Sequence, residues 1–256
     1  MANDLLNKNT AAYRKQVYHI GNINPRKLGY DEWFNSVDTQ FIKGEFTPAR
    51  VIEVNKNSFM VSDGTHEMPA ELSGKFIFDA EDSLDFPTVG DWVSIQALDN
   101  YMLAIIHKVL PRNTLLKRKE PGKRIEFQLI AANIDFGLII QSAEHPNFNL
   151  LDRFAVMLND SGIEPIIVFS KTDLLSSSEL EILKRDLLKS KSSFLFISNV
   201  TERGVKALSD NLLPGKTYCL LGQSGVGKTS ILNNLLGTDA FRVNEVRKKD
   251  GKGKHT

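Results

Sequence analysis

The chain has 256 residues, of which 41% are hydrophobic and 25% are charged, and its formal net charge is +1. This composition is typical of a globular protein with one large domain or two modest domains, and two is the better expectation. No apolar run approaches the roughly 18 residues needed to cross a bilayer, and the first residues are too polar for a secretory signal, so we expect a cytoplasmic protein. The single cysteine, Cys219, excludes an intrachain disulfide and a cysteine zinc cluster, and its apolar neighbours predict a buried thiol.

The small net charge hides two basic runs, at residues 117–124 and 247–254, which each carry five basic residues and one acidic residue. Such runs are either solvated faces or contacts to phosphates. Two of them in one chain favour an RNA partner. In the first run the candidate RNA-binding residues are Lys117, Arg118, Lys123 and Arg124.

The first part of the chain predicts a small β-barrel. We expect residues 1–40 to be a polar extension, partly helical or disordered, with one helical stretch at 30–37. Five short β-type segments follow within 41–112, at 49–56, 58–62, 67–72, 91–98 and 101–110, separated by turn signals such as Asp63-Gly64. This number of strands fits an OB-fold, and an SH3-like barrel fits nearly as well.

After a basic linker at 113–126, residues 127–256 alternate between strand and helix patterns. Strands are expected at 135–143, 164–170, 193–198 and 216–222, and helices at 148–162, 176–190 and 203–213, with a further helix from residue 230. Ser176 and Glu179 form a capping box at the start of the second helix. The series predicts an α/β domain with a mostly parallel sheet, helices on both faces, and ligands at the carboxyl ends of the strands.

Residues 222–229, Gly-Gln-Ser-Gly-Val-Gly-Lys-Thr, match the phosphate-binding loop (P-loop) pattern between a strand and a helix. Glycines let successive backbone N–H groups converge on a phosphate at the positive end of the following helix. Lys228 is expected to contact the β- and γ-phosphates, and the Thr229 hydroxyl to bind Mg²⁺. The predicted nucleotide-binding residues of this loop are Gly222, Gln223, Ser224, Gly225, Val226, Gly227, Lys228, Thr229 and Ser230.

Two further strand ends resemble the guanine-reading motifs of GTPases, Asn-Lys-x-Asp and Ser-Ala-x. They contribute the candidate GTP-binding residues Ser170, Lys171, Thr172 and Asp173, followed by Ser198 and Asn199. In such motifs the aspartate accepts hydrogen bonds from guanine N1 and N2, which adenine does not supply, so Asp173 carries the choice of base. Taken alone, this segment is also an ordinary strand-end turn. Ser170 and Asn199 replace the usual asparagine and alanine, so guanine affinity and selectivity are expected to fall, by about tenfold or less for one lost hydrogen bond.

The base-reading segments precede the P-loop, which reverses the common GTPase order. With the β-rich first domain, "IAANIDFGLII", "LLDRFAVML" and the ending "GKGKHT", the chain resembles the circularly permuted bacterial GTPases called ribosome small subunit-dependent GTPase A. The resemblance covers roughly residues 40–256. It implies an OB-fold followed by a permuted P-loop GTPase domain, GTP/GDP and Mg²⁺ as ligands, and subunit-stimulated GTP hydrolysis in late assembly of the small ribosomal subunit, by a monomer.

The same resemblance implies a continuation beyond residue 256, into a switch II motif and a zinc-binding module. We therefore expect a chain that is cut within switch I and has zinc only in that further module. The resemblance offers Thr256 as a second Mg²⁺ ligand and His255 as a catalytic, water-positioning residue. Two other functions remain open from the residues: an ATP-dependent phosphotransferase or ATPase that shares the P-loop, and an RNA-binding module with little turnover.

Overall fold

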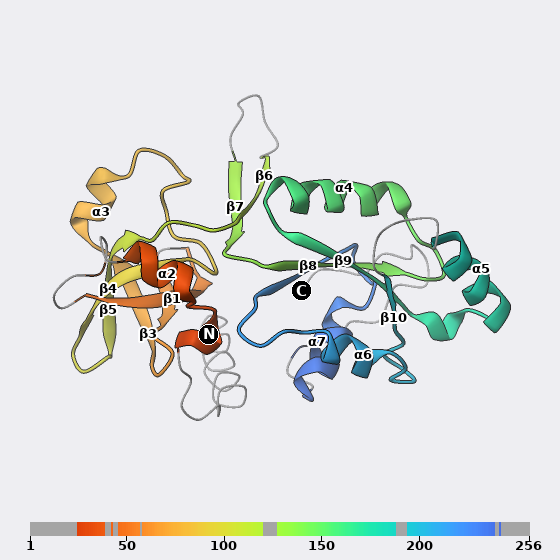
Figure 1. The fold of residues 1–256 in the computed structure, drawn as a ribbon. Helices are drawn as coiled ribbons and strands as arrows, with labels where there is room; N and C mark the ends of the chain where they lie inside the picture. The colour runs from red at the N-terminus through yellow and green to blue at the C-terminus, as the bar shows by residue number, and fades with distance from the viewer. Residues whose placement is uncertain are drawn as a thin grey trace, which may run out of the picture.

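A computed structural model describes residues 25–38, 42, 46–56, 58–119, 127–187, 194–238 and 241. It contains a β-barrel followed by an α/β domain, which lie side by side in Figure 1 with a two-stranded hairpin between them. Lys123, Arg124, the second basic run, His255 and Thr256 lie outside the described residues.

The barrel confirms the five strands expected from the sequence. They close in the order β1-β2-β3-β5-β4, in which β3 and β5 are parallel and the other neighbours are antiparallel. This closed order identifies the OB-fold and excludes the SH3-like alternative. Residues such as Val51, Met68 and Ile106 fill the interior with no exposed surface or almost none. The strands are β1 (Thr47–Val54), β2 (Phe59–Ser62), β3 (Glu67–Leu72), β4 (Trp92–Leu98) and β5 (Leu103–Val109).

Short helices decorate the barrel. The described part of the N-terminal extension forms the 3-10 helix η1 (Pro25–Leu28) and the expected helix, α2 (Glu32–Asp38). Tyr30 and Phe34 bury their rings against Trp92 and Leu110 of the barrel, so this part of the extension is packed. A further helix, α3 (Gly74–Asp79), begins at the N-cap residue Ser73 and was not expected from the sequence.

The segment expected to be a basic linker contains a strand. Strand β6 (Leu115–Lys119) pairs with β7 (Phe127–Ala132) in an antiparallel two-stranded sheet. Leu116 of β6 is buried in the hydrophobic core of the α/β domain. Apolar residues at the start of β6 therefore fix a strand that its charged end conceals in the sequence.

The α/β domain has a four-stranded parallel sheet in the order β10-β9-β8-β11, with helices on both faces as expected. Ile139 and Phe169 pack with α4 and α5, whereas the neighbouring Ile140 and Val168 pack with α6 and α7. This alternation follows from the period of two along a strand, and Figure 1 shows α4 on one side of the sheet and α6 and α7 on the other. The elements are β8 (Phe136–Ser142), α4 (Phe148–Asp160), β9 (Glu164–Ser170), η2 (Thr172–Leu174), α5 (Ser177–Leu187), β10 (Phe194–Phe196), α6 (Val205–Asp210), β11 (Tyr218–Leu221) and α7 (Lys228–Leu236).

The capping box at α5 is confirmed by reciprocal hydrogen bonds. The Ser176 N–H donates to the Glu179 carboxylate at 2.8 Å, and the Glu179 N–H donates to the Ser176 hydroxyl at 3.3 Å. These bonds satisfy donors that the first helical turn leaves without partners. The Ser176 hydroxyl, which donates to the Glu179 carboxylate at 2.6 Å, and the Ser176 N–H lower the pKa of the Glu179 carboxyl.

The buried Arg50, at the end of the barrel next to the α/β domain, bonds across to that domain. The guanidinium of Arg50 donates to the carbonyls of Leu28, Gly90 and Asn133, and burial lowers its pKa to about 10. Asp135, which begins the α/β domain, accepts from the Lys216 ammonium and the Thr217 N–H at 2.8 Å each. Arg50 therefore links the barrel to the segment before β8, and Asp135 links that segment to the one that leads into β11.

Candidate nucleotide-binding site

The glycine-rich loop joins the end of β11 to α7. Gly222 has φ +152°, and a Cβ there would lie 2.4 Å from the Ile140 carbonyl oxygen, so a larger residue does not fit. Gly225 and Gly227 have φ of 81° and 94°, in the left-handed region that favours glycine. The Gly227 carbonyl then accepts from the Ile231 N–H at 2.9 Å and starts the helix. The glycines thus permit the turn that brings backbone N–H groups toward the positive end of α7.

Lys228 folds back over this loop. Its ammonium donates to the carbonyl oxygens of Gly222 at 2.9 Å and Gln223 at 2.7 Å, and desolvation by burial lowers its pKa. A phosphate oxygen is a charged acceptor and binds an ammonium more strongly than a neutral carbonyl does. The cation therefore lies within the loop, where a nucleotide phosphate would compete for it.

Asp173 and Ser198, from the two upstream segments, are in direct contact. The Ser198 hydroxyl donates to Asp173 Oδ1 at 2.5 Å. The same Ser198 oxygen accepts from the N–H groups of Val200 and Thr201 at 3.3 and 3.2 Å. The tertiary structure thus brings together two residues that lie 25 positions apart.

The residues beside Asp173 fix its position. Lys171 has the left-handed conformation φ 58°, ψ 36°, which turns the chain sharply at the end of β9. Thr172 is buried, and its N–H donates to the Ile197 carbonyl at 3.2 Å. Asp173 itself is exposed at the start of η2. Its carboxylate is therefore held in place and accessible.

Ser170 and Asn199, which depart from the GTPase motifs, both contact the P-loop or the helix that follows it. The fully buried Ser170 hydroxyl lies 2.6 Å from the Val226 carbonyl oxygen and 3.1 Å from that of Gln141. The Asn199 carbonyl oxygen accepts from the Asn234 side-chain amide at 3.2 Å. These contacts were not foreseen, because the sequence shows only that the usual residues are replaced.

Gln141, at the end of β8, is a further residue that sequence patterns do not single out. Its side-chain oxygen accepts from the Asn147 N–H at 3.2 Å, and its backbone carbonyl faces the Ser170 hydroxyl. It is 1% exposed within an apolar strand. A buried glutamine at the ligand edge of the sheet was the available signal.

The structure also shows the surroundings of Cys219 and of two residues of the first basic run. Cys219 is partly buried, and burial raises the pKa of its thiol to about 11, which agrees with an unreactive thiol. Lys117 and Arg118 are exposed on β6, where the Lys117 ammonium lies 4.6 Å from the Phe127 ring centroid and Arg118 donates to Gln128 at 2.8 Å.

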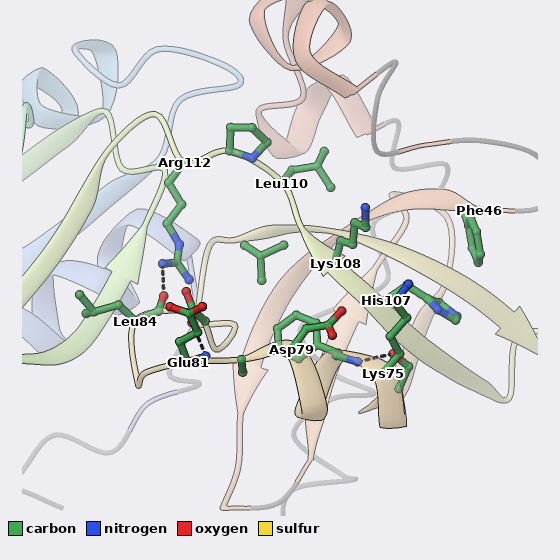
Figure 2. A pocket seen from close by; sticks show the side chains of 15 residues that line it. Phe46, Lys75, Asp79, Glu81, Leu84, His107, Lys108, Leu110 and Arg112 are labelled. Carbon is green, nitrogen blue, oxygen red and sulfur yellow. Dashed lines mark hydrogen bonds between the residues drawn. The ribbon is translucent and has the colours of Figure 1, made fainter.

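A cavity of about 810 Å³ lies elsewhere, between α3 and β5 of the barrel. Figure 2 shows Arg112 at one end and Phe46 with His107 at the other. Arg112 is occupied there by the Leu84 and Phe86 carbonyls and by two 2.8 Å bonds to the fully buried Asp91. Acidic and basic side chains both line this cavity, which therefore lacks the excess of positive charge that is typical of a phosphate-binding site.

The fold and site define a class: a P-loop domain in which the strand ends that carry Asp173 and Ser198 precede the P-loop, joined to an OB-fold barrel. The family model described as RsgA GTPase matches residues 109–256, and the chain belongs to this family.

Relatives and solved structures agree with this assignment. The chain is 34% identical over 231 residues to the small ribosomal subunit biogenesis GTPase RsgA 1 of Listeria innocua, covering 90% of this chain and 64% of the relative. It is 31% identical over 229 residues to the RsgA of Leptospira interrogans, covering 89% and 62%. It therefore spans less than two thirds of the length of these curated relatives.

The solved structures show the same fold. YjeQ from Thermotoga maritima aligns with a TM-score of 0.61 at 23% identity, covering 74% of this chain and 65% of that chain. YloQ, a circularly permuted GTPase, aligns with a TM-score of 0.58 at 24% identity, covering 74% and 63%. Both confirm the permuted GTPase fold expected from the order of the motifs.

Proposed function

We propose that this chain binds GTP and GDP and hydrolyses GTP, and that it acts in late maturation of the small (30S) ribosomal subunit, which with its rRNA stimulates turnover. Membership of the RsgA GTPase family and the names of its relatives support this function. The observation that carries it is the Asp173 carboxylate, held by Ser198 at the sheet edge that also presents the P-loop.

In this proposal, different residues contact the base and the phosphates of the nucleotide. Asp173 accepts from guanine N1 and N2, the Lys171 stem covers the base, and the loop after Ser198 offers a backbone N–H to the base oxygen. The P-loop N–H groups and Lys228 hold the β- and γ-phosphates, where positive charge stabilises the negative charge that develops in phosphoryl transfer.

Thr229 fits a Mg²⁺ ligand. It follows Lys228 in the first turn of α7, and a hydroxyl is an oxygen donor of the kind that Mg²⁺ prefers. Bound Mg²⁺ would neutralise charge on the phosphates. The roles of Thr256 as a second ligand and His255 in catalysis belong to the same proposal and concern residues outside the described part of the chain.

We propose that Lys117, Arg118, Lys123 and Arg124 contact rRNA. The exposure of Lys117 and Arg118 on β6 supports a phosphate contact. We further propose a cytoplasmic monomer with an N-terminal extension at 1–40, a barrel at 41–112 and a GTPase domain at 127–256. The expected linker at 113–126 contains β6, whose Leu116 packs in the core of that last domain, so this strand is assigned to it. Among the described residues no helix is long and apolar enough to cross a membrane, and no group of three or more His, Cys, Asp and Glu side chains could hold a metal ion.

An ATP-dependent phosphotransferase or ATPase is the main alternative, and Asp173 argues against it because adenine lacks the two donors that this carboxylate would accept. An RNA-binding module with little turnover is the other alternative. One experiment separates all three. GTP, GDP and ATP are titrated into the chain, and phosphate release from GTP is then followed with and without small ribosomal subunits. Preference for GTP over ATP with subunit-stimulated release supports the proposal, whereas equal binding of ATP contradicts it.

A further inference from the structure

The segments that would read the base are attached directly to the unit that would bind the phosphates. Ser170 ends β9, and Val226 lies inside the P-loop, 56 positions away, yet the Ser170 hydroxyl and the Val226 carbonyl oxygen are 2.6 Å apart. Asn199 follows β10, and its side chain accepts from Asn234 of α7, 35 positions away. Each base-reading strand end therefore has its own contact to the P-loop and α7.

The geometry favours Val226 as the partner of Ser170. A hydroxyl has one proton to donate. Its two acceptor carbonyls lie at 2.6 Å for Val226 and 3.1 Å for Gln141, so the shorter contact is the stronger bond. Ser170 has no exposed surface and Val226 is 6% exposed, so water does not compete for this bond. An unpaired carbonyl in such a place is costly.

The contact of Asn199 is packed as well as hydrogen-bonded. A Cβ at Gly227 would lie 3.2 Å from the Asn199 side-chain nitrogen. The Asn199 amide therefore lies against the glycine at the start of α7 while its oxygen bonds Asn234. The amide occupies the side of Gly227 on which any other residue would place its side chain.

We propose that Ser170 and Asn199 are positioning residues, which dock the two base-reading strand ends onto the P-loop and α7 and so fix the distance between the guanine-binding and phosphate-binding halves of the site. This inference rests on the proposed function. It reverses the expectation that both replacements weaken binding, because each side chain makes a bond of its own. A ligand that spans both halves gains from their fixed spacing, whereas a ligand that fills one half does not.

The test compares two ligands. Dissociation constants for GTP and for inorganic triphosphate, which fills only the phosphate half, are measured for the parent chain and for Ser170→Ala. We expect Ser170→Ala to lose about three- to tenfold in GTP affinity, as for one hydrogen bond, with unchanged affinity for triphosphate. Equal losses of affinity for both ligands would show that Ser170 only stabilises the P-loop, which would overturn the proposal. Unchanged GTP affinity would also overturn it.

Ser161→Ala is a matched control, since its hydroxyl also donates to a carbonyl of the same domain, that of Met157 at 2.8 Å, in the last turn of α4. It should leave both affinities unchanged. If Ser170→Ala fails to fold, Asn199→Ala, Asn234→Ala and the double variant carry the test. Their losses in GTP affinity should be non-additive, and additive losses would overturn the pairing. If the parent chain binds ATP as tightly as GTP, the proposed function is refuted. The comparison with inorganic triphosphate is then made with ATP in place of GTP, so the role of Ser170 is still tested.

Discussion

Replacing Asp173 by asparagine tests base recognition most directly. In the parent chain the Ser198 hydroxyl donates to Asp173 Oδ1 at 2.5 Å. An asparagine keeps this bond by placing its carbonyl oxygen toward Ser198, so its amide N–H₂ replaces the second carboxylate oxygen. That oxygen is the acceptor available to guanine, and the variant therefore opposes a donor to the guanine N–H groups.

The expected change follows from this reversal. Placing the amide N–H₂ of the variant against a guanine N–H group costs about 1–3 kcal/mol, or about five- to 150-fold in the Kd of GTP. Xanthine carries a carbonyl at position 2, so xanthosine triphosphate should gain affinity by a similar factor. Both constants are measured by competition against a fluorescent nucleotide. The phosphate contacts are unchanged, so inorganic triphosphate should bind as before.

Asp210→Asn is the matched control, because this exposed carboxylate of α6 pairs only weakly with Lys206 at the surface. It should bind GTP as the parent does. If Asp173→Asn also binds GTP like the parent and ignores xanthosine triphosphate, then Asp173 is a turn residue and the guanine assignment loses its main support.

Four other outcomes are expected. Lys228→Ala should abolish GTP binding or weaken it severely in calorimetric titration, because the ammonium inside the loop is lost; an unchanged Kd in the folded variant would remove the P-loop assignment. Neutralising Lys117, Arg118, Lys123 and Arg124 together should weaken RNA binding and flatten its dependence on salt, whereas an unaltered salt slope would indicate a solvated face. Arg112→Ala should lower the free energy of unfolding by about 3–5 kcal/mol, because the fully buried Asp91 loses its bidentate partner. Lys206→Ala is the control and should lower it by less than about 1 kcal/mol. Equal urea midpoints for the two variants would contradict this prediction. The native Cys219 thiol should react with a disulfide reagent much more slowly than the thiol of the urea-unfolded chain. Burial raises the pKa of the folded thiol from 9.0 to about 11. The contribution of this thiol to the stability of the fold is therefore complete below pH 9 and is lost as the pH rises toward 11. A thiol that reacts equally fast in the folded and unfolded chains would refute the shift.

Local chemistry allowed much of this fold to be predicted from the sequence. Short β-type segments between turn signals indicated the barrel strands, the alternation of strand and helix patterns indicated the parallel sheet, and Ser176 and Glu179 marked the start of α5. The P-loop was recognisable because it is contiguous: Gly222 and Gly227 must adopt backbone conformations that other residues avoid, and they lie within one short turn.

Charge concealed other elements. The basic end of β6 made residues 115–119 look like a linker, because two apolar residues are followed by three charged ones and show no alternation. Only the core position of Leu116 reveals that the strand belongs to the α/β domain. Helix α3 has no buried residues, and its apolar residues Phe76, Ile77 and Phe78 are consecutive instead of recurring every three or four positions, so no helical period shows in the sequence.

The tertiary structure decided how the site is joined. The sequence places Ser170, Asp173 and Ser198 at strand ends, but it does not state which atoms meet. Parallel strands bring residues that are 25 to 56 positions apart to one edge, where Ser198 bonds Asp173 and Ser170 bonds Val226. Sequence reasoning judged Ser170 and Asn199 against the usual residues and expected a loss, whereas a hydrogen bond depends on where donor and acceptor lie in space, and that distance is set by the packing of the whole domain.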